Sequence, residues 1–215
     1  MCSKEIDDSV AGVDEAGRGP WAGPVVAAAA ILSDESGAIL RAAGVDDSKA
    51  LSKTKRQRCF DIICEQQDLG TLSFALASAD PAEIDEHNIL GATMRAMTRA
   101  VTALPGTPNR VLIDGNRMPP DLPCPGETIV GGDAKILSIA AASILAKITR
   151  DRLMAALAEL HPGYGWERNA GYGTAEHRQG LESLGVTIHH RRSFAPIREI
   201  LERTPTSRLP ADSKH

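Results

Sequence analysis

Two apolar segments joined by a glycine-rich stretch most constrain what this chain can fold into. Residues 10–14 (VAGVD) and 24–32 (PVVAAAAIL) are typical of β-strands, because each is a short apolar run bounded by turn-forming residues. The sequence between them, GRGPWAG, supplies the glycines that a tight turn needs. We therefore expect a hairpin-like unit near the N-terminus, in which Asp14 and Glu15 stand where the first strand ends.

The rest of the chain alternates further strands with helices. Strands are expected at 72–79, 111–114 and 127–131, and helices after Ser52, after Pro81 and at 137–160, 174–184 and 196–203. The segment 137–160 is alanine-rich and apolar at first, which predicts a long helix whose first half is buried. This order of elements predicts an α/β fold, a mixed sheet with helices on its faces.

Length and composition suit one globular domain. The chain has 215 residues, of which 42% are hydrophobic and 24% charged, so it can bury a core without disulfides or metals. We expect one domain over residues 10–203 and a flexible tail at 204–215. The four cysteines form no CxxC pair, and the acidic N-terminal residues contain no apolar leader. These features favour a cytoplasmic protein with free thiols.

Four carboxylates stand beside glycines near the ends of predicted strands. Asp14 and Glu15 end the first strand, Asp114 ends the strand in VLIDGN, and Asp133 follows two glycines and opens the long helix. Any one of them could be a solvated loop residue or a helix N-cap. Together they point to one site, because ligands of open α/β sheets bind at the carboxyl ends of the strands. Converging carboxylates require cations between them, and oxygen ligands suit Mg²⁺ or Mn²⁺.

Basic residues are clustered although the net charge is −4. The clusters lie at 53–58, 147–152 and 189–192. Each alone is more often a solvated face than a binding site. Their segregation favours a groove for the phosphate backbone of a nucleic acid.

Two glycine-rich loops hold all the tryptophans and tyrosines. Trp21 lies in GRGPWAG, and Tyr164, Trp166 and Tyr172 lie in HPGYGWERNAGYG, where they could stack on a base or sugar. GRGPWAG lacks the spacing of a dinucleotide-binding loop or a P-loop, and a tight turn alone would explain its glycines. The functional alternative is that its backbone approaches a sugar-phosphate and recognises a 2′-hydroxyl.

Seven motifs in order closely resemble those of bacterial ribonuclease HII, from about Val10 to about Arg198. They are GVDEAGRGPWAGPVVAAA, DDSKALS, IDEHNILGATMRAM, VLIDGN, GGDAKILSIAAASILAKITRDR, HPGYGWERNAGYGTAEH and HRRSF. The resemblance implies a ribonuclease H-like fold: a five-stranded mixed sheet flanked by helices, with a small C-terminal helical part. It also implies an endonuclease that hydrolyses the RNA strand of RNA–DNA hybrids. Such an enzyme nicks on the 5′ side of a single ribonucleotide in duplex DNA, leaving 3′-hydroxyl and 5′-phosphate ends.

The resemblance also assigns residues by motif. It implies that two divalent ions, Mg²⁺ or Mn²⁺, are held by an acidic tetrad made of Asp14, Glu15, Asp114 and Asp133. It implies that substrate is bound by the GRG motif at Gly17, Arg18 and Gly19, by the sugar-stacking Tyr172 and by the segment that includes Ser48 and Lys49. Ala170 departs from the pattern, because many family members have a lysine there.

Other functions remain open at this point. Ribonuclease HIII is a near relative, but it usually carries an extra N-terminal domain, and only about ten residues precede the first strand here. A non-catalytic nucleic-acid-binding module should lack one of the acids, and all four are present. A small-molecule phosphohydrolase would not need the basic clusters or the loop aromatics. We expect a monomer that acts on RNA–DNA hybrids and ribonucleotide-containing DNA duplexes and binds no membrane.

Overall fold

An antiparallel hairpin forms the centre of the structure. A computed structural model describes residues 9–45 and 51–203. Strands β1 (Val10–Ala16) and β2 (Val25–Leu32) pair antiparallel, with Asp14 opposite Ala28. The predicted hairpin is confirmed, although β1 continues two residues beyond Asp14.

Three further strands complete a mixed sheet in the order β3–β2–β1–β4–β5. They are β3 (Leu72–Ala79), β4 (Arg110–Asp114) and β5 (Gly126–Ile129). Strand β3 pairs antiparallel with β2, whereas β4 runs parallel to β1, and β5 runs parallel to β4. Because β1, β4 and β5 share one direction, their carboxyl ends meet at the same edge of the sheet. This five-stranded mixed sheet confirms the predicted fold class.

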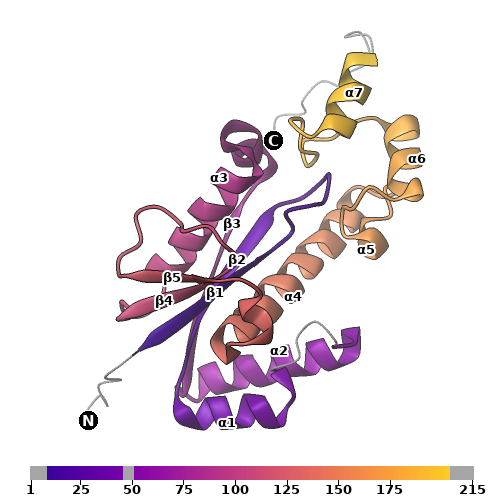
Figure 1. Cartoon of the computed structure of the whole chain (residues 1–215). Helices are drawn as coiled ribbons and strands as arrows, with labels where there is room; N and C mark the ends of the chain where they lie inside the picture. Colours follow the sequence, from indigo (N-terminus) through magenta and orange to yellow (C-terminus); the bar gives the residue numbers. More distant parts are fainter. Residues whose placement is uncertain (1–8, 46–50, 204–215) are drawn as a thin grey trace.

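Helices cover both faces of the sheet (Figure 1). Helix α3 (Pro81–Thr102) packs on one face. The other face is covered by α1 (Asp34–Ala42), α2 (Lys53–Asp68) and α4 (Leu137–Leu160). Within the described ranges, no helix is long and apolar enough to cross a membrane.

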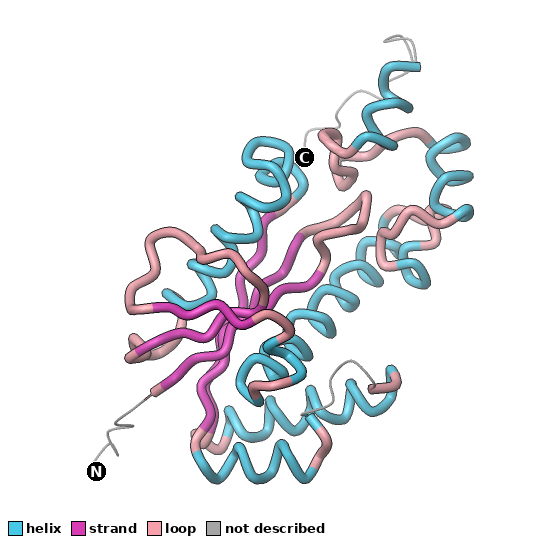
Figure 2. Tube along the Cα trace, viewed as in Figure 1, coloured by secondary structure: helices cyan, strands magenta, loops and turns pink. Residues whose placement is uncertain are grey.

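A small helical part follows the far end of α4 (Figure 2). It contains the helices α5 (Trp166–Asn169), α6 (Ala175–Leu184) and α7 (Ala195–Arg203). Its own apolar cluster includes Trp166, Leu181 and Ile197 and extends onto Met154 of α4. The predicted C-terminal helical part is therefore confirmed, and the predicted tail at 204–215 lies outside the described residues.

Small residues let the layers approach closely. Strand β2 is buried along all but its last residue, and its four consecutive alanines leave room for helices on both faces. On β1, a Cβ added to Gly12 would lie 2.2 Å from the carbonyl carbon of Ser138 and 2.3 Å from the amide nitrogen of Ile139. The first turn of α4 thus rests directly on β1, two residues before Asp14.

Two local features differ from the sequence-based expectation. Helix α1 was not expected, although Ser33 caps it by accepting a hydrogen bond from the Ser36 amide, a pattern that the sequence contains. Helix α3 is kinked at Asn88, whose φ is +57°. The Asn88 side chain accepts hydrogen bonds from the amides of Leu90 and Gly91 and so caps the second half of the helix. Hydrophobic periodicity does not reveal such a break.

Two buried histidines join the C-terminal part to the loop that carries Tyr172. The Nδ1 atom of His177 lies 3.0 Å from the Tyr172 carbonyl, and its Nε2 accepts a hydrogen bond from Trp166. The Nε2 atom of His190 lies 3.1 Å from that of His177, and its Nδ1 accepts from the Thr187 amide. A carbonyl can only accept and an amide can only donate, so the protons sit on Nδ1 of His177 and Nε2 of His190. Both rings are therefore neutral.

We expect this pair to make stability depend on pH. Burial, reinforced by the neighbouring His177, lowers the pKa of His190 to about 3, whereas an unfolded histidine has a pKa of about 6.5. The unfolded chain therefore binds a proton that the folded chain does not. His190 therefore contributes to the free energy of unfolding above pH 6.5. This contribution is lost as the pH falls below 6.5, by about 1.4 kcal/mol per pH unit.

Urea unfolding at pH 7, 6 and 5 checks this expectation. The variant His190→Phe keeps an aromatic ring but cannot titrate, so its free energy of unfolding should fall less steeply over this range than that of the parent. Equal slopes for parent and variant would show that His190 is protonated in the folded protein.

The contact between β1 and α4 gives a second expectation. Gly12→Ala should destabilise the fold by about 3 kcal/mol or more, because the new methyl group meets helix backbone that cannot move aside. Gly106→Ala is the matched control, since a Cβ at Gly106 meets nothing within 4 Å. We expect it to change the free energy of unfolding by less than about 1 kcal/mol. Similar urea midpoints for the two variants would contradict the packing described here.

Candidate active site

Carboxylates from three adjacent segments line one cavity at the carboxyl edge of the sheet. The cavity has a volume of about 450 Å³. Its acidic residues come from β1, from the end of β4 and from the 3₁₀ turn η2 (Gly132–Ala134), and they are Asp14, Glu15, Asp114 and Asp133. The parallel pairing of β1 with β4 places the first three together. The structure thus brings together all four acids that the sequence singled out.

Asp133 reaches the cavity from η2 rather than from the long helix. Helix α4 begins only at Leu137, so the expectation that Asp133 opens this helix is wrong. The turn is fixed by Asp114, whose Oδ1 accepts hydrogen bonds from the Gly132 amide at 2.6 Å and the Asp133 amide at 3.4 Å. A Cβ at Gly132 would lie 2.6 Å from Cδ1 of Ile139. A side chain at this position would therefore require Ile139 to shift, because the turn passes closely between the strand end and the helix.

Burial and mutual repulsion set the charge state of the carboxylates. Desolvation raises the pKa of Asp14 well above its usual value, and the charges of Glu15 and Asp114 raise it further. A side-chain hydrogen bond with Ser143 and the Glu15 amide act in the opposite direction. Burial also raises the pKa of Glu15, opposed by the guanidinium of Arg18, which lies 3.2 Å from its Oε1. Positive charge placed among these groups would relieve their repulsion.

The donor set suits hard divalent cations. The cavity offers carboxylate oxygens and no thiol or imidazole, which fits Mg²⁺ or Mn²⁺. Among the described residues, however, no three His, Cys, Asp or Glu side chains converge closely enough to form a complete cage for one ion. Mg²⁺ is usually held by one or two carboxylates together with water and substrate phosphates, so it does not require three protein ligands.

The glycine-rich loop lies beside the carboxylates. Gly17 lines the cavity and has φ +98°, a conformation that favours glycine. Arg18 is exposed and turns its side chain back to Glu15. A Cβ added to Gly19 would lie 3.4 Å from Cε1 of Tyr172, so the ring lies directly against this loop.

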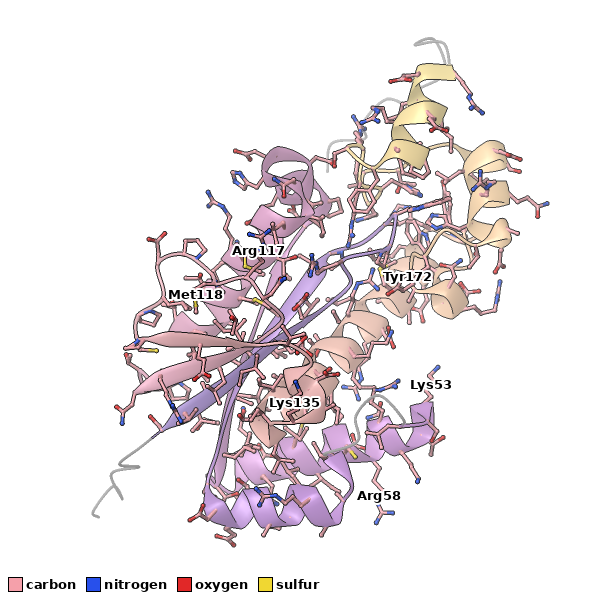
Figure 3. All side chains as sticks on the ribbon, viewed as in Figure 1. Lys53, Arg58, Arg117, Met118, Lys135 and Tyr172 are labelled. Carbon is pink, nitrogen blue, oxygen red and sulfur yellow. The ribbon has the colours of Figure 1, made fainter. Side chains whose placement is uncertain are left out.

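Tyr172 is held against the same loop by backbone contacts. Its side chain lines the cavity, and the residue is 47% exposed; Figure 3 shows it beside the tip of the hairpin. The Trp21 amide donates a hydrogen bond to the Gly171 carbonyl at 2.8 Å. A Cβ at Gly171 would lie 2.6 Å from the Ala22 carbonyl oxygen. The two glycine-rich loops therefore form one wall of the site.

Several residues expected to face nucleic acid are instead buried. Tyr164 and Trp166 are 3% and 1% exposed and stack on each other, so they belong to the core of the C-terminal part. The segment 189–192 is not a basic surface as a whole, because His190 and Arg191 are buried. Arg150 is likewise buried rather than presented along the surface of α4. Of the loop aromatics, Tyr172 alone is exposed in the described part of the chain.

Four other polar residues of the cavity were not predicted as site residues. They are Arg56, Ser143, Lys147 and Arg150. The arginines and the lysine fell within the basic clusters, whereas the alanine-rich surroundings of Ser143 gave no signal. Ser48 and Lys49, expected to bind substrate, lie outside the described residues.

A second, larger groove adjoins the cavity. It has a volume of about 770 Å³, runs between α2 and the helices α4 and α5, and shares Arg56 and Lys147 with the carboxylate cavity. Lys53 and Arg58 also line it, and Figure 3 shows both on α2. Two of the three basic clusters therefore border one groove that opens beside the four acids.

Comparison with known proteins places the sequence among close relatives. A family model described as Ribonuclease HII matches residues 11–197. Ribonuclease HII from Ruegeria pomeroyi is 54% identical over 192 residues, which cover 89% of this chain and 78% of that protein. Ribonuclease HII from Paracoccus denitrificans is 53% identical over 198 residues, covering 92% and 90% of the two chains.

Solved structures agree with this relationship. The ribonuclease H2 from Pyrococcus horikoshii superposes with a TM-score of 0.78 at 29% identity, covering 91% of this chain and 98% of that one. Bst-RNase HIII, at 22% identity and a TM-score of 0.68, shares the fold, and 90% of this chain aligns with 69% of it. The chain therefore belongs to the ribonuclease HII family, whose members are metal-dependent endonucleases that cleave the RNA of RNA–DNA hybrids.

Proposed function

We propose that this enzyme, besides cleaving hybrids, nicks duplex DNA on the 5′ side of a single embedded ribonucleotide. The products would carry a 3′-hydroxyl and a 5′-phosphate. The observation that carries the proposal is the shared cavity, in which Asp14 and Asp114 lie beside Gly17 and Tyr172. A phosphodiester held by the acids would place its neighbouring sugar against the loop and the tyrosine.

The proposed catalytic groups are the four carboxylates, Asp14, Glu15, Asp114 and Asp133. They would hold two divalent ions, Mg²⁺ or Mn²⁺, whose chemistry is to lower the pKa of the attacking water and to stabilise the leaving 3′-oxygen. The chain's own contribution is to keep the carboxylates together despite their repulsion. The rigid β1–α4 contact at Gly12 and the hydrogen bonds from η2 to Asp114 support this.

Substrate recognition is assigned to the two loops. The backbone of Gly17, Arg18 and Gly19 would meet the ribose 2′-hydroxyl, which can both donate and accept a hydrogen bond. The exposed ring of Tyr172 would stack on the sugar of the next deoxynucleotide. The basic groove along α2 would bind the phosphate backbone of the duplex, together with Ser48 and Lys49.

The alternatives are less well supported. A binding module without chemistry does not need four buried or half-buried acids in one cavity. A small-molecule phosphohydrolase does not need the 770 Å³ basic groove.

We further propose that residues 10–203 form one catalytic domain. A monomeric state and a cytoplasmic location, which the free thiols of Cys59, Cys64 and Cys124 favour, stay predictions.

A nicking assay tests the proposed function. The substrates are a DNA duplex with one internal ribonucleotide, the same duplex without it and a long RNA–DNA hybrid, each with Mg²⁺, Mn²⁺ or chelator. We expect metal-dependent cleavage of the first and third, with the nick 5′ of the ribonucleotide. Tyr172→Ala should lower the nicking rate about tenfold through loss of stacking, whereas Tyr172→Phe should keep it. Cleavage of the hybrid alone would contradict the proposal that the two loops recognise a single ribonucleotide within DNA.

Asp14→Asn should separate activity from stability. It should lower cleavage about a thousandfold, because several kcal/mol of charge stabilisation is lost and each 1.4 kcal/mol is about tenfold in rate. Without added metal it should also raise the melting temperature by about 2–4 °C, because a buried, repelled charge is removed.

The control for this variant is Asp68→Asn, which neutralises an exposed carboxylate at the end of α2. It should change neither property. A melting temperature that falls for Asp14→Asn would contradict the repulsion described here.

A further inference from the structure

Two arginines are buried beneath the glycine-rich loop without an acidic partner. Arg150 and Arg191 are 1% and 0% exposed. In the described part of the chain neither forms a salt bridge. Burying an unpaired charge is costly unless its donors are fully hydrogen-bonded. Their hydrogen bonds therefore indicate what these two guanidinium groups are for.

Each guanidinium binds backbone carbonyls. Arg191 donates to the carbonyls of Gly17, Arg18 and Gly23, at 2.5, 2.9 and 3.0 Å. Arg150 donates to the carbonyls of Pro24, Ala170 and Ala22, at 2.9, 2.8 and 3.1 Å. Five of these six carbonyls belong to the β1–β2 loop, and the sixth belongs to the loop that carries Tyr172.

Because a peptide unit is rigid, these contacts also fix the direction in which the amides of the loop point. The peptide bond is planar and trans, so the N–H points away from the C=O of the same unit. When Arg191 holds the carbonyls of Gly17 and Arg18, the amides of Arg18 and Gly19 must point to the opposite side, away from the buried guanidinium. Both residues are exposed, and within residues 9–45 and 51–203 neither amide donates a hydrogen bond.

The glycines of the loop are adapted to this support. A Cβ at Gly17 would lie 1.9 Å from Nε of Arg150, and one at Gly23 would lie 2.1 Å from Sδ of Met154. The loop backbone therefore rests directly on Arg150 and its neighbour one turn along α4. Because Arg150 also binds the Ala170 carbonyl, the same side chain fixes the spacing between the glycine-rich loop and Tyr172.

We propose that Arg191 and Arg150 are positioning residues for ribonucleotide recognition. Arg191 fixes two peptide planes so that the amides of Arg18 and Gly19 present a pair of donors to the ribose 2′-oxygen. Arg150 locks this pair at a set distance from the Tyr172 ring. The inference rests on the proposed function, because it explains how the backbone of the loop can tell RNA from DNA.

The test compares binding of two duplexes by Arg191→Lys and the parent. Lysine keeps the charge but cannot bridge three carbonyls as the guanidinium fork does. The ligands are a fluorescent DNA duplex with one ribonucleotide and its all-DNA counterpart, with Ca²⁺ replacing Mg²⁺ so that cleavage is prevented. We expect the ratio of the two Kd values to fall about tenfold in the variant, while the Kd for all-DNA stays within twofold.

Arg192→Lys is the matched control, since this neighbouring arginine is exposed. It should keep the parent's ratio. An unchanged ratio in folded Arg191→Lys, or an equal loss of affinity for both duplexes, would overturn the proposal. If the parent itself shows no preference for the ribonucleotide duplex, the proposed function fails first, and the two failures are thereby distinguished.

A double-mutant cycle tests the part assigned to Arg150. If Arg150 acts by placing Tyr172, then Arg150→Lys should lower the nicking rate in the parent but have little further effect in Tyr172→Ala. Independent, additive effects would show that Arg150 does not act through the ring.

A measurement on the unaltered protein covers the case in which Arg191→Lys does not fold. In the free protein, the amide protons of Arg18 and Gly19 should exchange rapidly with solvent. Their NMR resonances should shift on addition of the ribonucleotide duplex with Ca²⁺. The all-DNA duplex should shift them much less. Equal shifts with both duplexes would contradict the assigned direction of the two amides.

Discussion

The contact between buried guanidinium groups and backbone carbonyls holds the site together. Arg150 comes from the middle of α4 and Arg191 from the segment before α7, yet both meet on the loop between β1 and β2. A loop with three glycines among its eight residues (17–24) has little rigidity of its own. Six hydrogen bonds from two side chains replace that missing rigidity. The C-terminal helical part therefore does more than extend the fold, since it supplies one of the two supports.

A second constraint comes from the sheet. Parallel pairing of β1 with β4 places Asp14 and Asp114 at one edge, and the turn η2 adds Asp133. Close strand–helix packing keeps these acids together, although burial and the neighbouring carboxylates raise the pKa of Asp14. Arg150 lines the same cavity. The carboxylates and the buried guanidinium of Arg150 therefore line one cavity, next to the loop that we propose meets the ribose.

The sequence indicated the carboxylates of the cavity better than the residues that support its loops. The acids that line the cavity could be picked out because strand ends beside glycines are visible as a pattern, whereas Tyr172 was assigned only by its resemblance to a ribonuclease HII motif. Arg150 and Arg191 looked like members of solvated basic clusters, and Trp166 looked like a stacking residue. No local feature of the sequence distinguishes an arginine that binds phosphate from one that binds backbone carbonyls more than 120 residues away. The kink at Asn88 was also not predicted, because the regular apolar spacing of this helix begins only at Leu90, after the break.

The most direct test is a crystal structure of the Asp14→Asn variant bound to a DNA duplex that contains one ribonucleotide. We predict that the 2′-oxygen lies within hydrogen-bond distance, about 3 Å, of the amides of Arg18 and Gly19. The carbonyls of Gly17 and Arg18 should remain on Arg191, and the Tyr172 ring should lie on the next sugar. A complex in which these amides point away from the ribose, or in which the loop leaves Arg191, would contradict it.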